Sequence, residues 1–247
     1  AVLSKGDYVD PFSNTLFPLI WGYLHPKGSS GMHTAALIAF CEVIENGGSA
    51  AKRIAEKFME PACIYATDED PTVRQSAVYG IGVAAQSLDS GFAKYSDGAL
   101  KCLVKVITSK DARGEEYGES TDNAISSVGK IIKIFAKYNA KALPEVMPMW
   151  LSWLPAKTDE EEAPVVHSML LDFLEDFKSP IYGKNNSNLV KILSVLGEVS
   201  KTELVDERTQ GRIKALLGRI SSGLNNQQVN ELRSSLGPQI WGKLQAM

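Results

Sequence analysis

Residues 70–83 decide the fold, and they read DPTVRQSAVYGIGV. Asp70 offers a carboxylate to the first free backbone amides of a helix, and Pro71 suits the first helical turn. The apolar residues that follow recur at spacings of three and four rather than in strict alternation. The stretch therefore predicts a helix that begins at Pro71.

Gly80, Gly82 and Ala85 match the G-x-G-x-x-A pattern of dinucleotide-binding proteins. That pattern needs a strand before the glycines and a helix after them. Here both glycines lie inside the helical run, so we interpret them as positions where another helix packs closely.

The pair Ala77-Val78 belongs to a series in which a small residue precedes a large apolar one. The other members are Ala36-Leu37, Ala124-Ile125, Ser168-Met169 and Ala215-Leu216. The pairs begin at residues 36, 77, 124, 168 and 215, so successive pairs lie 41, 47, 44 and 47 residues apart. A helical pattern with this period is typical of HEAT and armadillo repeats.

The predicted fold is all-α, an α-α superhelix (a HEAT-repeat solenoid) of about five helical hairpins with a C-terminal capping helix. The hairpins are expected at about 10–46, 49–88, 92–138, 142–177 and 186–222, and the capping helix at about 226–244. One hairpin cannot bury its apolar face alone, so residues 1–247 are expected to form a single array. No run alternates with period two between turns, so we expect no strands.

The composition argues against several classes of function. A formal net charge of -3 does not suit a nucleic-acid-binding protein, and no run approaches the roughly 18 apolar residues of a membrane span. The three histidines lack metal-ligand spacing, and the sequence has no nucleophile elbow and no Walker loop. We therefore expect no enzyme, cofactor, direct nucleic-acid binding or membrane insertion. Three cysteines without C-x-x-C spacing predict reduced thiols, as in the cytosol or nucleus.

Acidic residues at the predicted starts of second helices are the candidate binding site. Residues 159–162 read DEEE, the densest charge run, and they open a predicted helix, where negative charge complements the helix dipole. The functional alternative is a concave surface for a basic partner protein, formed by Asp122, Asn123, Asp159, Glu160 and Glu162. Asp70 and Arg74 are expected instead to belong to a structural ladder between successive repeats.

Several separate segments resemble one family in order and in spacing. Residues 70–83 resemble a HEAT repeat of the karyopherin beta-3 (importin-5) group in the importin-beta superfamily, as does NAISSVGKI at 123–131. The most specific match is LPEVMPMWLSWLP at 143–155, followed by DEEEA at 159–163, and NNSNLVKI at 185–192 is also similar. The resemblance covers about residues 10–222 and corresponds to the C-terminal repeats of the family.

The resemblance implies a nuclear transport receptor that shuttles between cytoplasm and nucleus. Such receptors bind cargo proteins with basic nuclear localisation signals on the concave surface of their second helices. They contact Phe-Gly nucleoporins between first helices, where an exposed aromatic ring would suit the peptide. Ran-GTP releases import cargo, mainly through N-terminal repeats that we expect this chain to lack.

Two expectations remain open. Most of the large aromatic residues should lie in the core, and the sequence does not single out an exposed one; the candidates are Trp21, Trp150, Trp153, Trp241, Phe12 and Phe17. The rival interpretation is a HEAT scaffold subunit of a phosphatase or chromosome complex. It shares the fold, and fold alone does not determine function.

Overall fold

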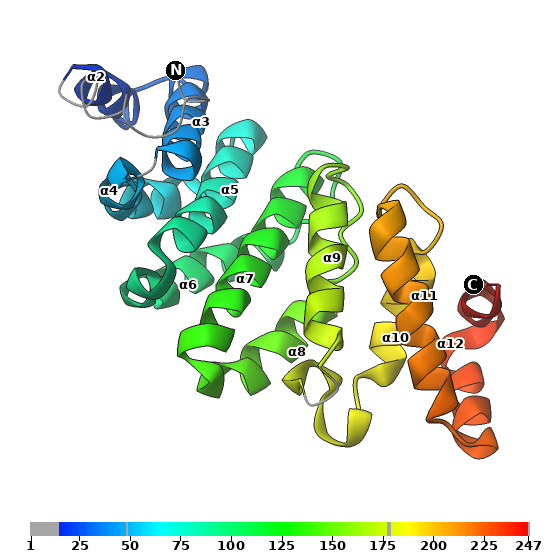
Figure 1. Cartoon of the computed structure of the whole chain (residues 1–247). Coiled ribbons are helices and arrows are strands. Elements are labelled where there is room, and N and C mark those ends of the chain that lie inside the picture. Colours follow the sequence, from blue (N-terminus) through cyan, green and yellow to red (C-terminus); the bar gives the residue numbers. More distant parts are fainter. Residues whose placement is uncertain (1–14, 48, 177–178, 247) are drawn as a thin grey trace. The chain divides into compact units, whose positions relative to one another are not determined.

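The computed structural model describes residues 15–47, 49–176 and 179–246, and every regular element among them is a helix. The helices follow one another as α2 (Leu16–Tyr23), α3 (Ser30–Asn46), α4 (Ser49–Tyr65), α5 (Pro71–Leu88), α6 (Ser96–Ile107), α7 (Gly118–Tyr138), α8 (Leu143–Trp153), α9 (Glu162–Leu174), α10 (Leu189–Val199), α11 (Glu207–Ser222) and α12 (Asn226–Gln245). Short 3-10 helices include η2 (Asp89–Lys94) and η4 (Pro180–Tyr182). This all-α fold of successive helical hairpins confirms the predicted class (Figure 1). The expected helical residues 10–14 and 177, and Phe12 among the aromatic candidates, lie outside the described residues.

The chain divides into two compact units, with the boundary between Tyr138 and Asn139. The first unit contains helices up to α7, and the second contains α8 to α12. The two units are described separately below, and the expected single array over 1–247 stays a prediction.

Helix starts follow the capping rules of the sequence. The carboxylate of Asp70 accepts hydrogen bonds from the amides of Thr72 and Val73 at the start of α5, and Asp206 caps α11 through the amide of Thr209. Asn225 and Gln228 form a reciprocal capping box at the start of α12. These side chains satisfy amides that the helix itself leaves without partners.

The core of the first unit is built around α5, which packs against α3, α4 and α7. A Cβ atom added at Gly80 would lie 2.5 Å from Cζ of Phe58 and 2.7 Å from Sγ of Cys41. A Cβ added at Gly82 would lie 2.5 Å from Oγ of Ser127, and that hydroxyl donates to the carbonyl of Val78 at 2.6 Å. The close approach predicted for these two glycines is confirmed.

The core of the second unit centres on Trp150 of α8, which is fully buried and meets Phe173 of α9 edge to face. Neighbouring second helices are joined by Arg212 of α11. Its guanidinium donates through Nη2 to Asp172 of α9 and to Glu175, which directly follows α9, each at 2.8 Å. Nη1 of Arg212 also donates to the carbonyl and the hydroxyl of Ser168, at 3.4 and 3.3 Å, so one side chain of α11 binds α9 at several points.

The capping helix α12 is not continuous, contrary to the prediction of one helix at about 226–244. Gly237 has φ 72° and ψ 167°, which interrupts the helical backbone, and Pro238 begins the following helical segment. Ile240 and Leu244 of this segment lie beside Gly197 of α10, where an added Cβ would come within 2.8 Å and 3.4 Å of them. The break therefore turns the last residues onto α10.

Candidate functional site

The residues of the predicted ladder, Asp70 and Arg74, lie at the start of α5 and each contacts a neighbouring segment. Arg74 donates from Nε and Nη2 to the carbonyl of Asp68, at 2.9 and 2.6 Å. Its guanidinium also lies 3.9 Å above the ring of Tyr117, whose hydroxyl donates to the carbonyl of Glu69 at 3.0 Å. Arg74 and Tyr117 thus join the start of α5 to the loop that precedes α7.

Asp70 contributes to the same region through hydrogen bonds. The amide of Val73 and, to a smaller degree, the hydroxyl of Ser30 and the amide of Thr72 lower the pKa of Asp70. Ser30 begins α3, the second helix of the preceding hairpin. The link between repeats therefore runs from Ser30 to Asp70 and from Arg74 to Tyr117.

Two of the predicted acidic and amide residues at α7 are buried. Asp122 is fully buried and accepts from Nη1 of Arg113 at 2.8 Å, while Asn123 is 3% exposed and donates to the carbonyl of Glu119 at 3.0 Å. Both side chains are occupied inside the unit, so neither presents a free surface to a partner.

At α9 the predicted residues separate into buried and exposed ones. Asp159 and Glu162 are buried, and Oδ1 of Asp159 accepts from the amides of Glu161 and Glu162, at 3.0 and 2.8 Å. Glu160 is exposed. Of the five residues predicted to form one concave surface, Glu160 is thus the one that could meet a partner directly, and their joint role in binding stays a prediction.

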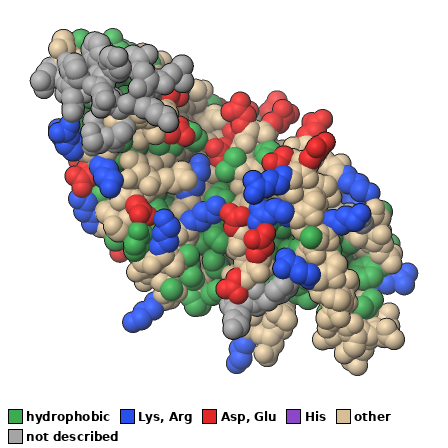
Figure 2. All heavy atoms as spheres, in the orientation of Figure 1, with side chains coloured by type: hydrophobic (Ala, Val, Ile, Leu, Met, Phe, Trp, Pro, Cys, Tyr) green, Lys and Arg blue, Asp and Glu red, His purple; other side chains and the backbone are tan. Residues whose placement is uncertain are grey.

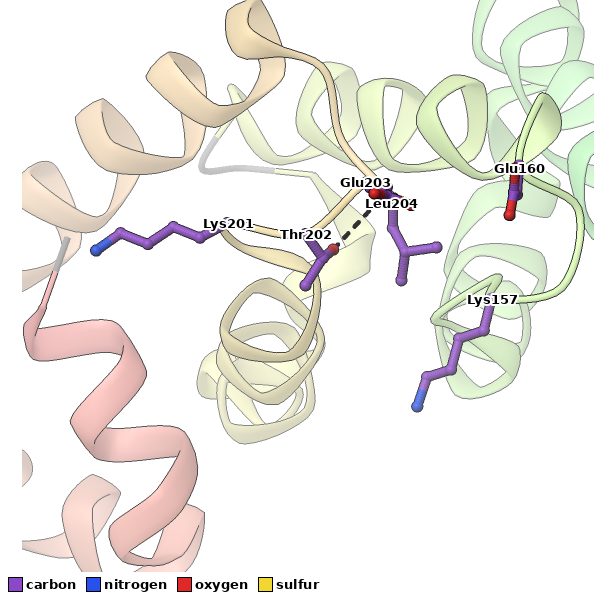
Figure 3. A pocket seen from close by; sticks show the side chains of 6 residues that line it. All are labelled: Lys157, Glu160, Lys201, Thr202, Glu203 and Leu204. Carbon is purple, nitrogen blue, oxygen red and sulfur yellow. Dashed lines mark hydrogen bonds between the residues drawn. The ribbon is translucent and has the colours of Figure 1, made fainter.

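Glu160 lies at the edge of a cleft of about 590 Å³, which we call the loop cleft. It is lined by residues from the segment before α9 and the segment before α11: Lys157, Glu160, Lys201, Thr202, Glu203 and Leu204 (Figure 3). His167 of α9 holds the second segment in place, because its Nδ1 lies 2.8 Å from the carbonyl oxygen of Leu204.

The lysines of the loop cleft are engaged by neighbouring groups. Lys157 pairs with Glu198 at 2.7 Å, and although burial opposes it, this pairing keeps the pKa of Glu198 below its ordinary value. The amine of Lys201 points away from Glu160 in Figure 3 and donates to the carbonyl of Ala246 at 2.7 Å. Glu160 and Glu203 are exposed, so the cleft offers two carboxylates beside the apolar side chain of Leu204.

In Figure 2, basic and acidic side chains are intermingled over the face in view.

A second cavity, of about 560 Å³, lies in the first unit between the first helices α4 and α6. We call it the first-helix groove; its lining residues are Glu56, Lys57, Met59, Glu60, Cys63, Ile64, Lys94, Tyr95 and Gly98. Ile64 exposes 64% of its surface there, and the ring of Tyr95 is partly exposed. The combination of an apolar floor and a charged rim is typical of peptide-binding grooves.

The rim of the first-helix groove is ordered by contacts between α4 and the segment before α6. Lys94 donates to Glu56 at 2.8 Å, and the hydroxyl of Tyr95 donates to the carbonyl of Glu56 at 3.3 Å. Tyr95 was not among the aromatic residues singled out from the sequence, of which Trp150 is fully buried. Tyr95 follows Phe92 and Ala93 closely in the sequence, and nothing in this pattern predicted that Tyr95 would be exposed.

Metal-ligand clusters and helices that could span a membrane are both absent from the described residues. Among the described residues, no three His, Cys, Asp or Glu side chains are grouped so that they could hold a metal ion. The helices in the same part of the chain are all too short or too polar to cross a membrane.

Comparison with known proteins relates this chain to importins, although no family model matches it. It is 28% identical over 190 residues to "Probable importin-5 homolog" of Dictyostelium discoideum, covering 75% of this chain and 18% of that protein. It is 27% identical to importin subunit beta-3 of Saccharomyces cerevisiae, covering 76% of this chain and 17% of that protein. Importin-4 of Mus musculus is 24% identical over 96% of this chain and 20% of its own length.

Solved structures agree on the fold. The crystal structure of the karyopherin Kap121p bound to the SUMO protease Ulp1p matches 98% of this chain and 21% of that one, with a TM-score of 0.68 and 23% identity. The chain thus spans about a fifth of the length of the proteins that it matches. By sequence, this chain is therefore similar to importins of the karyopherin beta-3 type.

Proposed function

We propose that this chain is the C-terminal HEAT-repeat part of a nuclear import receptor, a karyopherin beta that carries cargo proteins between cytoplasm and nucleus. The observation that carries the proposal is the similarity to importin-5 and importin beta-3 proteins over three quarters of the chain. In this proposal the loop cleft contacts cargo and the first-helix groove contacts nucleoporins.

The loop cleft is the proposed contact for cargo with a basic localisation signal. Glu160 and Glu203 present carboxylates to solvent, and Leu204 offers a surface for the aliphatic part of a lysine or arginine side chain. Binding of this kind is electrostatic and weakens as salt rises. The solved complex of Kap121p with Ulp1p lends support, because that karyopherin holds a protein partner.

Charge reversal tests the loop cleft. Replacing both Glu160 and Glu203 by lysine in the intact receptor should weaken binding of a basic cargo about tenfold, or by about 1.4 kcal/mol. The matched control reverses two exposed glutamates of the second unit outside the cleft, Glu145 and Glu231. Equal affinity of both double variants for the cargo would remove the loop cleft from the proposal.

The first-helix groove is the proposed contact for Phe-Gly nucleoporins. A phenylalanine ring would pack on Ile64, Met59 and Tyr95. Ile64→Asp should weaken binding of a labelled Phe-Gly peptide to this chain about tenfold. Ile38→Asp on α3, another exposed isoleucine, is the control and should leave binding unchanged.

Ran-dependent release tests the function as a whole. The full-length receptor is immobilised with a nuclear cargo, and Ran locked with GTP is added. Release by the GTP form and not by the GDP form is the expected result. If Ran-GTP does not bind at all, the chain is better described as part of a HEAT scaffold of a phosphatase or chromosome complex.

A further inference from the structure

Two cysteine side chains from successive hairpins face each other. Cys63 of α4 and Cys102 of α6 are free thiols whose sulfur atoms lie 3.6 Å apart. Both residues are partly exposed, and Cys63 lines the first-helix groove. The sulfur atoms are thus in van der Waals contact at a surface that small molecules can reach.

The two thiols differ in their chemistry. Cys102 can donate a hydrogen bond to the sulfur of Cys63, which lowers the pKa of Cys63 although burial opposes the effect. The same interaction, together with burial, raises the pKa of Cys102. Cys63 is therefore the thiol that ionises first, and the thiolate is the reactive form of cysteine.

We propose that Cys63 and Cys102 form a reversible disulfide that links α4 to α6 when the protein meets hydrogen peroxide. The sulfur atoms must move from 3.6 Å to about 2.05 Å apart, within the reach of side-chain torsions on two helices that already touch. Such disulfides in reducing compartments are transient and respond to oxidants. This inference does not rest on the proposed transport function.

The reaction proceeds in two balanced steps. The Cys63 thiolate attacks one oxygen of the peroxide; an S–O bond forms, the O–O bond breaks, and the hydroxide that leaves is protonated to water. Cys102 then loses its proton and attacks the sulfur of Cys63; the S–S bond forms, the S–O bond breaks, and a second water leaves. Two thiols are oxidised to one disulfide while one peroxide is reduced to two waters.

The third cysteine serves as an internal control. Cys41 of α3 is buried, and burial raises its pKa to about 12. It should stay reduced under conditions that oxidise the other two. A general oxidation of all thiols would not show this pattern.

Mass spectrometry of the full chain tests the proposal. Treatment with peroxide should remove two hydrogens per chain, digestion should yield one peptide pair joined through Cys63 and Cys102, and dithiothreitol should reverse both changes. Crosslinks that join two chains, or that include Cys41, would overturn the proposal.

Two serine variants separate the roles of the thiols. In Cys102→Ser, peroxide should leave a sulfenic acid on Cys63 that dimedone traps. In Cys63→Ser, far less dimedone adduct should form at Cys102. Equal trapping in both variants would refute the assigned order. If circular dichroism shows that either variant folds poorly, the wild-type chain is titrated with mixtures of reduced and oxidised glutathione instead. Absence of an intramolecular disulfide at every ratio of the two would overturn the proposal.

Discussion

Replacing Gly80 by alanine should destabilise the first unit, although alanine is the better helix former. Gly80 lies inside α5, and the added Cβ would come 2.5 and 2.6 Å from Cζ and Cε1 of Phe58 and 2.7 Å from Sγ of Cys41. Ordinary contacts of a Cβ atom begin near 3.4 Å. Both neighbours are buried, so neither can move into solvent.

Two opposing contributions set the size of the effect. Alanine gains about 1 kcal/mol of helix propensity over glycine, because the unfolded chain loses less conformational freedom. Inserting a methyl group into a packed core costs about 1–3 kcal/mol, and the overlap with two buried side chains places Gly80→Ala at the upper end of that range. We expect a net loss of about 2 kcal/mol in the free energy of unfolding.

Urea denaturation followed by circular dichroism measures this loss. A glycine with open space around it is the matched control: Gly98 lies in α6 of the same unit and has nothing within 4 Å of its Cβ position. Gly98→Ala should therefore raise stability by about 0.5 kcal/mol, opposite in sign. In a Phe58→Leu background the cost of Gly80→Ala should shrink, since leucine lacks the two ring atoms in collision.

The reasoning on Gly80 would be refuted by a midpoint at or above that of the wild type, with an unchanged dependence on urea. That result would mean that α4 and α5 separate at no cost, which a packed interior does not allow.

Three further predictions concern other parts of the chain. Burial raises the pKa of Tyr182 to about 12, so the neutral phenol contributes stability that is complete below its unfolded pKa of about 10 and is lost as pH rises through 12. Tyr182→Phe should flatten the fall in stability over that window in alkaline denaturation, and an identical pH profile would contradict the assignment. Gly237→Ala should cost about 1–3 kcal/mol, because its backbone region is nearly restricted to glycine; an unchanged melting temperature would argue against the break in α12. Asp122→Ala should cost about 1–3 kcal/mol in urea denaturation, because the buried carboxylate of Asp122 accepts a charge-assisted hydrogen bond from Arg113, whose side chain is 44% exposed; stability equal to that of Glu160→Ala would show that this bond contributes nothing.

Sequence reasoning succeeded where the local signal is also the cause of the structure. Asp70 and Pro71 predicted the start of α5 because capping and a fixed φ act within a few residues. The glycines of α5 could be interpreted in the same way, since a glycine inside an apolar helix needs a neighbour that uses the space.

Exposure was harder to predict, because it depends on residues that are distant in sequence. Asp122 carries a charge and would ordinarily lie at the surface, but its buried carboxylate is paired with the guanidinium of Arg113. Asp159 lies three residues before the start of α9, and its carboxylate accepts from the amides of Glu161 and Glu162 instead of facing a partner. Ala215, the last small residue of the recurring series, is exposed, whereas Ala77 is fully buried.

Gly237 was missed for another reason. The polar sequence of α12 is typical of one capping helix. The Gly237-Pro238 pair within it is compatible either with a continuous but less stable helix or with a break. Only contacts of the following segment with Gly197 of α10 select the break.

The contacts between second helices also imply that stiffness is unevenly distributed. Ser127 is seated against Gly82 and bonded to the carbonyl of Val78, so α7 cannot slide along α5 by a fraction of a turn without losing both contacts. Between α9 and α11, by contrast, the long side chain of Arg212 spans to two carboxylates that are partly open to water. An applied strain should therefore be taken up at α9 and α11 while α5 and α7 move as one piece, and salt should soften only the former pair.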